Sequence, residues 1–230
     1  MELFPLSGVW ALLFTCGAFM FGQYLRKKTG SAFCNPTLIC ALLVIAFLLI
    51  SGIPNKVYQE SMKLTSWLMT PCTVCLGIPF YTQLKRMQGN LKAIFIGVTA
   101  GAVASLAMIG AGCVLIRLDH ELMVSLLPKS VTMAMAIPLV EPTDGYVPLT
   151  TFAVIITGIG GSMIGQSLCK LCGIRHPIAQ GVAFGTASHV MGTSRATELN
   201  ELSGAVGSLS LCVAGILTAV LFSPAMKLFM

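Results

Sequence analysis

The sequence predicts an all-α protein: a polytopic transmembrane helical bundle with about six crossing helices and two broken or re-entrant segments, arranged as an inverted repeat. Hydrophobic residues make up 56% of the 230-residue chain and charged residues only 10%, whereas soluble domains carry about 25% charge. Several apolar runs reach the roughly 20 residues that a helix needs to cross a bilayer. Two further apolar segments are interrupted by proline, glycine and charged residues.

Charge and cysteine content narrow the functional classes. The net charge of +6 comes from lysines and arginines scattered between apolar runs, a pattern typical of cytoplasmic loops and not of a nucleic-acid-binding surface. The nine cysteines lie mostly inside apolar runs and are interpreted as packing residues, so no metal and no cofactor is predicted. No glycine-rich phosphate loop and no nucleophile with an evident base occurs, so an enzyme is not predicted.

The first two apolar runs, 3–21 and 37–53, predict two crossing helices. The basic triplet Arg26, Lys27 and Lys28 follows the first run, and no basic residue precedes it. Because cytoplasmic loops are enriched in positive charge, this places the N-terminus outside and the triplet in the cytoplasm.

The third run, 64–84, contains Pro71 and Pro79. A proline inside a helix removes a backbone hydrogen bond and kinks the helix. The segment is therefore either a broken helix that lines the interior or a bent structural helix. Three later runs, 93–116, 148–168 and 205–222 with its extension, predict further crossings.

The two broken segments are 121–141 and 177–198. Loop 142–147 contains Asp144 and no Lys or Arg, whereas loop 170–176 is basic. If the first segment crossed fully, the acidic loop would lie inside and the basic loop outside. We therefore expect this segment to enter and return to the outside, in agreement with the positive-inside rule.

An offset of 56 residues relates the two broken segments. It maps Ser130 onto Thr186 and Thr132 onto Ser188, and it also maps the fourth run onto the fifth. One crossing helix in each unit inverts the next unit, which is an architecture common in secondary transporters. We expect a single membrane domain, 1–230, with N-terminal helices 1–88, candidate repeats 89–143 and 145–199, and a last helix 204–230.

Polar residues at membrane depth are costly and suggest function. Hydroxyls and free helix amides bind small anions, and a cation neutralises a carboxylate. The candidate substrate-binding residues are Lys129, Ser130, Thr132, Thr186, Ser188, His189, Thr193 and Arg195. The candidate helix-break or packing residues are Pro71, Pro79, Pro128, Gly185 and Gly192.

Each of these residues has a structural alternative. Serine and threonine hydroxyls often bond their own i−4 carbonyls, and Arg195 can snorkel to the surface or pair with Glu198. His189 is either a proton carrier or a hydrogen-bonded packing residue. In an unbroken helix, Thr186, His189 and Thr193 share one face.

The paired motifs resemble the LrgB/CidB family. They are Leu126-Leu127-Pro128-Lys129-Ser130-Val131-Thr132, Gly185-Thr186-Ala187-Ser188-His189 and Gly192-Thr193-Ser194-Arg195-Ala196. The resemblance covers nearly the whole chain. Residues 133–137, where family members often carry a Pro-Ile-Ala stretch, depart from the pattern.

The resemblance implies a multi-pass protein of the bacterial cytoplasmic (inner) membrane with a smaller LrgA/CidA-type membrane partner. It implies an antiholin-like role that modulates murein hydrolase activity and autolysis. The family is also similar to the C-terminal part of the plant plastidial glycolate/glycerate transporter, and related bacterial systems are linked to pyruvate uptake.

Two hypotheses follow. The first is a secondary transporter of small monocarboxylates of the glycolate, glycerate, pyruvate or lactate type, because two matched helix breaks suit a carrier. The second is a holin-like or antiholin-like regulator, acting as an oligomeric pore or as the partner of one. The expected partners are a small carboxylate, the lipid bilayer, the LrgA/CidA-type protein and possible further copies of this chain.

Overall fold

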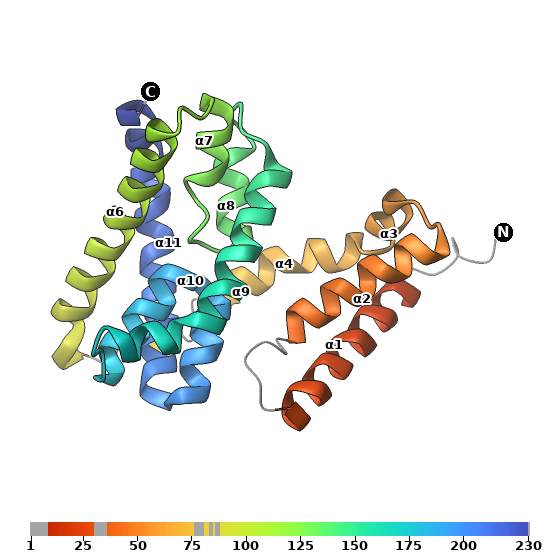
Figure 1. Cartoon of the computed structure of the whole chain (residues 1–230), viewed down its shortest axis with the longest axis horizontal. Coiled ribbons are helices and arrows are strands. Elements are labelled where there is room, and N and C mark those ends of the chain that lie inside the picture. The colour runs from red at the N-terminus through yellow and green to blue at the C-terminus, as the bar shows by residue number, and fades with distance from the viewer. Residues whose placement is uncertain (1–8, 30–35, 76–80, 83–84, 86–87, 230) are drawn as a thin grey trace. The chain divides into compact units, whose positions relative to one another are not determined.

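The computed structural model describes residues 9–29, 36–75, 81–82, 85 and 88–229, and within these ranges it is helical and contains no strand (Figure 1). This confirms the all-α prediction. The elements are α1 (Val9–Thr29), α2 (Pro36–Ser51), α3 (Asn55–Ser61), α4 (Lys63–Cys75), the 3-10 turn η1 (Gln88–Asn90), α6 (Leu91–Leu115), α7 (His120–Leu126), α8 (Met133–Val140), α9 (Val147–Leu171), α10 (Pro177–Leu199) and α11 (Glu201–Phe229).

The chain forms two compact units, residues 1–75 and 76–230, which are considered separately. In the first unit, α1 packs on α2 and α3 through aromatic side chains. The rings of Phe14 and Phe47 lie 4.3 Å apart, and the hydroxyls of Thr15 and Tyr58 are hydrogen-bonded at 2.8 Å. Pro71 lies inside α4, whereas Pro79 falls outside the described residues.

The second unit is built on three long apolar helices, α6, α9 and α11, of 25, 25 and 29 residues. Each is long and apolar enough to cross a membrane, and α2 of the first unit is a shorter apolar helix. The total of about six crossings stays a prediction. The core lies where α11 meets α6 through buried aliphatic side chains, namely Ile94, Val98, Val206, Leu209 and Val213.

Small residues bring α10 close to α11. A Cβ atom at Gly185 would lie 2.4 Å from the carbonyl oxygen of Gly207, and one at Gly181 would lie 2.5 Å from that of Ser203. Only glycine allows these backbones to approach so closely, as is common between helices in membranes. Gly185 therefore acts as a packing residue.

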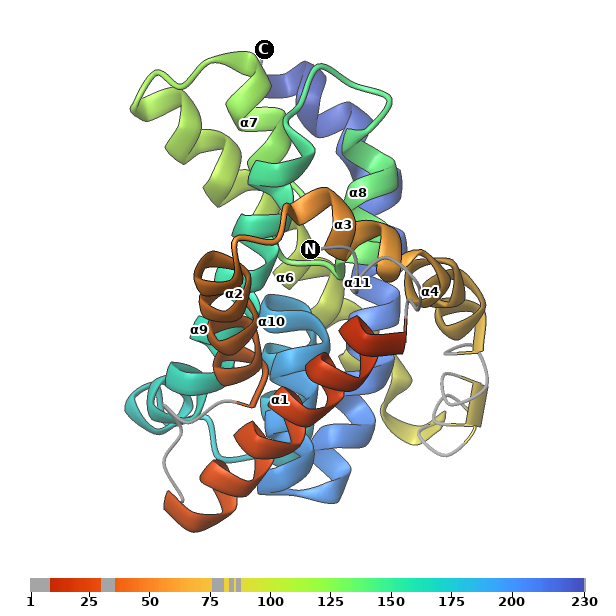
Figure 2. The same ribbon diagram turned by 90° about the vertical axis from the view of Figure 1, so that its right-hand side faces the viewer.

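Helices α7 and α8 form a short hairpin near one end of the second unit (Figures 1 and 2). Val124 of α7 and Val140 of α8 belong to one hydrophobic cluster, and residues 127–132 connect the two helices. At 1.5 Å per residue each helix is only about 10–12 Å long, whereas a hydrocarbon core is about 30 Å thick. Neither helix of this hairpin is long enough to cross a bilayer alone.

Helix α10 is also a hairpin, near the opposite end of the unit (Figures 1 and 2). Its backbone leaves helical geometry at Ser188 (φ −135°, ψ 19°) and His189 (φ 43°, ψ −135°). Beyond this break the second half of α10 folds back on the first half. The close approach is seen at Gly192, where an added Cβ would lie 2.4 Å from the carbonyl oxygen of Phe184.

The local geometry repeats at the 56-residue offset. Helix α6 spans 91–115 and α9 spans 147–171, so both ends of the two helices correspond. The break in α10 at Ser188 corresponds to Thr132, which precedes the first residue of α8.

The two long helices also end alike. The residue after each helix cap has a positive φ: 54° at Arg117 and 68° at Gly173. Glycine adopts this left-handed conformation freely, whereas an L-residue such as arginine adopts it at a cost of about 1–2 kcal/mol. The next amides, of Leu118 and Ile174, donate to the carbonyls of Cys113 and Cys169 at 2.9 and 2.8 Å, which is the helix-ending pattern of a Schellman motif.

Candidate functional site

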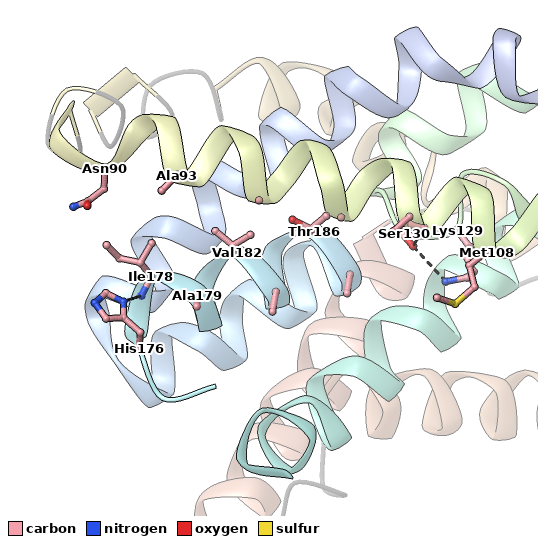
Figure 3. Close-up of a pocket in the computed structure, with 16 residues that line it drawn as sticks. Asn90, Ala93, Met108, Lys129, Ser130, His176, Ile178, Ala179, Val182 and Thr186 are labelled. Carbon is pink, nitrogen blue, oxygen red and sulfur yellow. Dashed lines mark hydrogen bonds between the residues drawn. The ribbon is translucent and has the colours of Figure 1, made fainter. Parts of the chain in front are cut away.

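A cavity of about 690 Å³ runs along α6 and the first half of α10 (Figure 3). Asn90 and His176 lie at one end, and Lys129 and Ser130 lie at the other. Its walls are mostly small and apolar, including Ala93, Gly97, Gly101, Ala104, Val182 and Ala183. The cavity therefore leads from one end of the second unit to the turn of the α7–α8 hairpin.

Three of the predicted substrate-binding residues line this cavity: Lys129, Ser130 and Thr186. The Lys129 Nζ donates to the Ser130 hydroxyl at 3.3 Å, and that hydroxyl is hydrogen-bonded to Ser105 of α6 at 2.8 Å. Among the described residues Lys129 makes no ion pair. A half-buried ammonium group thus lines the cavity, and its partner within the described part of the chain is a hydroxyl.

Thr186 reaches the cavity from the other hairpin. Its side chain is 6% exposed, and its Oγ1 is buried without a hydrogen-bond partner among the described residues. Its methyl group packs against Gly101, where a Cβ would lie only 2.8 Å away. An unpaired buried hydroxyl costs about 1–3 kcal/mol, and the hydroxyls of Ser203 and Ser210 in α11 are also unpaired among the described residues.

Five predicted residues lie outside the cavity lining: Thr132, Ser188, His189, Thr193 and Arg195. Thr132 begins α8 with extended geometry (φ −70°, ψ 152°), and its side chain makes no capping hydrogen bond. The Thr193 hydroxyl donates to the His189 carbonyl at 2.9 Å. This is the i−4 bond that serine and threonine often make within their own helix.

The face that Thr186, His189 and Thr193 would share in an unbroken helix does not form, because the helix breaks at Ser188 and His189. Thr186 and His189 cannot keep i, i+3 spacing because the backbone reverses between them. His189 instead lies against α9, where its Nε2 bonds the carbonyl oxygen of Val154 at 3.1 Å. A carbonyl only accepts, so this nitrogen carries the proton and the ring position is defined by the bond.

Both hairpin turns meet α9 at the same place. Val131 and Ala136 of the first hairpin pack in one cluster with Val154, which also accepts from His189 of the second. Ser188 lies against Gly161 of α9, where an added Cβ would overlap the Ser188 hydroxyl. The buried Pro128 forms part of the first turn.

Arg195 is engaged in a local network. Its Nη1 donates to Glu198 at 2.8 Å and its Nη2 donates to Gln166 of α9 at 2.7 Å. The side chain is 22% exposed. This geometry matches the structural alternative, in which Arg195 forms an i, i+3 ion pair with Glu198. The hydrogen bond to Gln166 also connects α10 to α9.

Sequence reasoning missed Ser105 as a neighbour of the site. A signal was present, because Ala93, Gly97, Gly101 and Ser105 recur every four residues and so follow one face of a helix. In the structure all four line the cavity. Gln166, the second partner of Arg195, had no comparable signal in the sequence.

Comparison with known proteins gives consistent matches over almost the full chain. Residues 15–228 match the family model described as "LrgB-like family". "Holin-like protein CidB" of Staphylococcus epidermidis is 29% identical over 224 residues, covering 97% of this chain and 98% of that protein. "Antiholin-like protein LrgB" of Bacillus subtilis is 29% identical over 216 residues, covering 94% of each. No solved structure matches.

These relatives are bacterial, and the described residues include three helices suited to crossing a bilayer. It is therefore a multi-pass bacterial membrane protein.

Proposed function

Because this chain belongs to the LrgB-like family, we propose that it has the holin-like or antiholin-like role that the names of its relatives state. The observation that carries this proposal is the alignment with "Holin-like protein CidB", which spans 97% of the chain. The family is one of membrane proteins and not a known enzyme family. In this role the protein alters membrane permeability, alone or with an LrgA/CidA-type partner, and so modulates murein hydrolase activity and autolysis.

This role predicts leakage that depends on assembly. Liposomes containing the purified protein, with and without the small partner, should release a trapped fluorescent dextran once the protein oligomerises. Cells that lack the protein should change their rate of autolysis. If the liposomes retain dextran at every protein-to-lipid ratio and autolysis is unchanged in cells that lack the protein, the proposal is wrong.

A second candidate function is secondary transport of small monocarboxylates. The observation that favours it is the arrangement of the two hairpins, which approach from opposite ends and meet beside a cavity containing Lys129. A simple pore does not need two matched half-depth hairpins, whereas many transporters place broken helices at the centre of the membrane. The relatives' names support the first role more directly than this one.

The transport reading includes an inverted repeat, with units 89–143 and 145–199. Its support is the common offset of the helix bounds, of the positive-φ caps and of the two breaks. Each unit then has one crossing helix followed by one re-entrant hairpin, and the two hairpins enter from opposite faces. Together with α11 and the N-terminal helices this makes about six crossings.

One liposome experiment separates the two functions. A carrier should give saturable uptake of labelled lactate, pyruvate, glycolate or glycerate, with or without a pH gradient, and retain dextran. A holin-like pore should release dextran and show no saturation with carboxylate. Absence of uptake of all four acids, with the LrgA-type partner present, would reject transport.

A further inference from the structure

The inner end of the cavity holds an unbalanced positive charge. Lys129 is half-buried, and in the described part of the chain its ammonium donates only to the Ser130 hydroxyl. A cation at this depth is costly unless an anion or several hydrogen bonds compensate it. The other cation predicted to act here, Arg195, is already paired with Glu198. The missing counter-charge for Lys129 is therefore not supplied by the described protein.

The same end holds an unused hydrogen-bonding group. The Thr186 Oγ1 is buried and without a partner among the described residues, although its side chain lines the cavity (Figure 3). Buried hydroxyls in native proteins nearly always have a partner. Lys129 and Thr186, on two different hairpins, thus line one volume. The Lys129 ammonium lacks a counter-charge that a small anion would provide, and the Thr186 Oγ1, which protein atoms cover, reaches such an anion after rotation about the Cα–Cβ bond.

The walls restrict which anion fits. One ammonium balances one negative charge, and a dianion would leave a second charge buried. Between this end and the far end, where Asn90 and His176 lie, the walls are alanine, glycine, valine, isoleucine and methionine residues of α6 and α10. These surfaces suit a short apolar carbon body and offer no partner to a second charged group.

We propose that the inner end of this cavity is a binding site for a small organic monoanion, in which Lys129 is the counter-ion and Thr186 a hydrogen-bond partner, entered from the end marked by Asn90 and His176. Ser130 and Ser105 orient the Lys129 ammonium through their hydrogen-bonded hydroxyls. The biological role of this site rests on the proposed transport function. Anion binding itself can be measured without transport.

At the opposite end of the second unit, hydrogen bonds join α7 to the start of α9. The Ser125 hydroxyl accepts from the Tyr146 amide at 2.7 Å, and Thr150 donates to the Ser125 carbonyl at 2.9 Å. The Tyr146 hydroxyl donates to Glu121. At the corresponding places α6 and α10 carry Ile94 and Gly181 instead of Thr150 and Ser125, so the end with the cavity lacks these bonds.

Isothermal titration of the full-length protein in detergent with sodium lactate tests the site. Wild type should bind saturably, the neutral analogue lactamide should not bind, and the dianion succinate should bind more weakly. Lys129→Gln should bind lactate about ten- to a hundred-fold more weakly, the loss of a hydrogen bond to a charged group. Thr186→Val should bind about two- to ten-fold more weakly, the loss of a neutral one.

Matched controls come from the same unit. Lys170→Gln removes an exposed lysine at the end of α9, and Thr151→Val removes a hydroxyl that bonds only its own helix, to Val147 at 3.0 Å. Both should bind lactate as wild type does. The site is overturned if wild type binds neither lactate nor pyruvate, or if Lys129→Gln, with a wild-type melting temperature, binds normally.

Thiol labelling tests whether the cavity opens at the end where Asn90 and His176 lie. In a chain without other cysteines, Ala183→Cys on the cavity wall should react with a membrane-impermeant thiol reagent added on the side of residue 172, and lactate should slow the reaction. Reaction only from the side of residue 144 would reverse the assigned entrance. Lactate binding without any uptake into liposomes would leave the site standing and reject transport instead.

Discussion

The hairpins α7–α8 and α10 resemble each other in backbone but differ in how they are held. Both turn back at positions related by 56 residues, and both turns lie beside Val154 of α9. The first hairpin is tied to α9 by the bonds of Ser125 and Tyr146. The α10 hairpin meets α6 through glycine and aliphatic residues and leaves a cavity there. Similar local geometry thus gives a closed contact at one end and an open one at the other.

The largest expected effect concerns the side of the membrane on which each loop lies, because labelling of a loop should occur from one side and not from the other. If the hairpins enter from opposite faces, Asp144→Cys should react with an impermeant thiol reagent only from outside, and the exposed native Cys172 only from inside. The physical reason is the positive-inside rule applied to the two loops. Thiol labelling of intact cells and of inverted vesicles measures both, and labelling of position 144 from the cytoplasm would contradict the re-entrant α7–α8 hairpin.

The next largest effect separates the two cations. Lys129→Ala should abolish carboxylate-dependent flux, because the cost of about 1.5–3 kcal/mol for a lost charged hydrogen bond weakens binding roughly ten- to a hundred-fold. Arg195→Lys should leave flux near wild type and cost stability by no more than about 1 kcal/mol, since a partly exposed ion pair contributes little. Uptake of labelled lactate by proteoliposomes, compared at equal protein content, decides this; equal losses in both variants would place Arg195 at the site.

A third prediction concerns the fold of the α10 hairpin. Gly192→Ala should destabilise the protein by about 1–3 kcal/mol, because the new Cβ would lie 2.4 Å from the carbonyl oxygen of Phe184 and 2.6 Å from the Cβ of Ser188. Gly160→Ala is the matched control, since a Cβ there meets nothing within 4 Å. Thermal unfolding in detergent should show a lower midpoint for the first variant only. Equal midpoints would mean that the two halves of α10 do not pack as described.

The smallest effect concerns the closed end. Tyr146→Phe removes the donor to Glu121 and should lower the unfolding midpoint only slightly, because this hydrogen bond is exposed to solvent. The bond to Glu121 also raises the pKa of the Tyr146 phenol, so the hydroxyl stays protonated and remains the donor at neutral pH. If this contact closes the outer end, Tyr146→Phe should let impermeant reagents reach Ala183→Cys from the side of residue 144. If Ala183→Cys is still labelled from one side only, the hydrophobic cluster around α7 and α8, and not the Tyr146 hydroxyl, blocks access from the side of residue 144.

Much of the architecture was predictable because it follows from local chemistry. Apolar runs longer than about 17 residues can only be helices in a bilayer, where every backbone group needs an internal partner. Pro128 and the glycines located both breaks, and the offset between them anticipated the matching bounds of α6 and α9. The same offset singled out Ser130 and Thr186, which the structure brings to one cavity.

The sequence by itself determined the helical membrane class and the positions of the two breaks, and it proposed candidate residues for an anion site. It could not assign partners to them, because a hydrogen bond depends on which helix lies opposite. Only the tertiary structure added Gln166 to the Glu198 pair that the sequence offered for Arg195, turned His189 towards Val154, and left Lys129 without a counter-ion among the described residues. The reversal at Ser188 and His189 decided these outcomes, because it sends neighbouring side chains of one apparent helix to different neighbours.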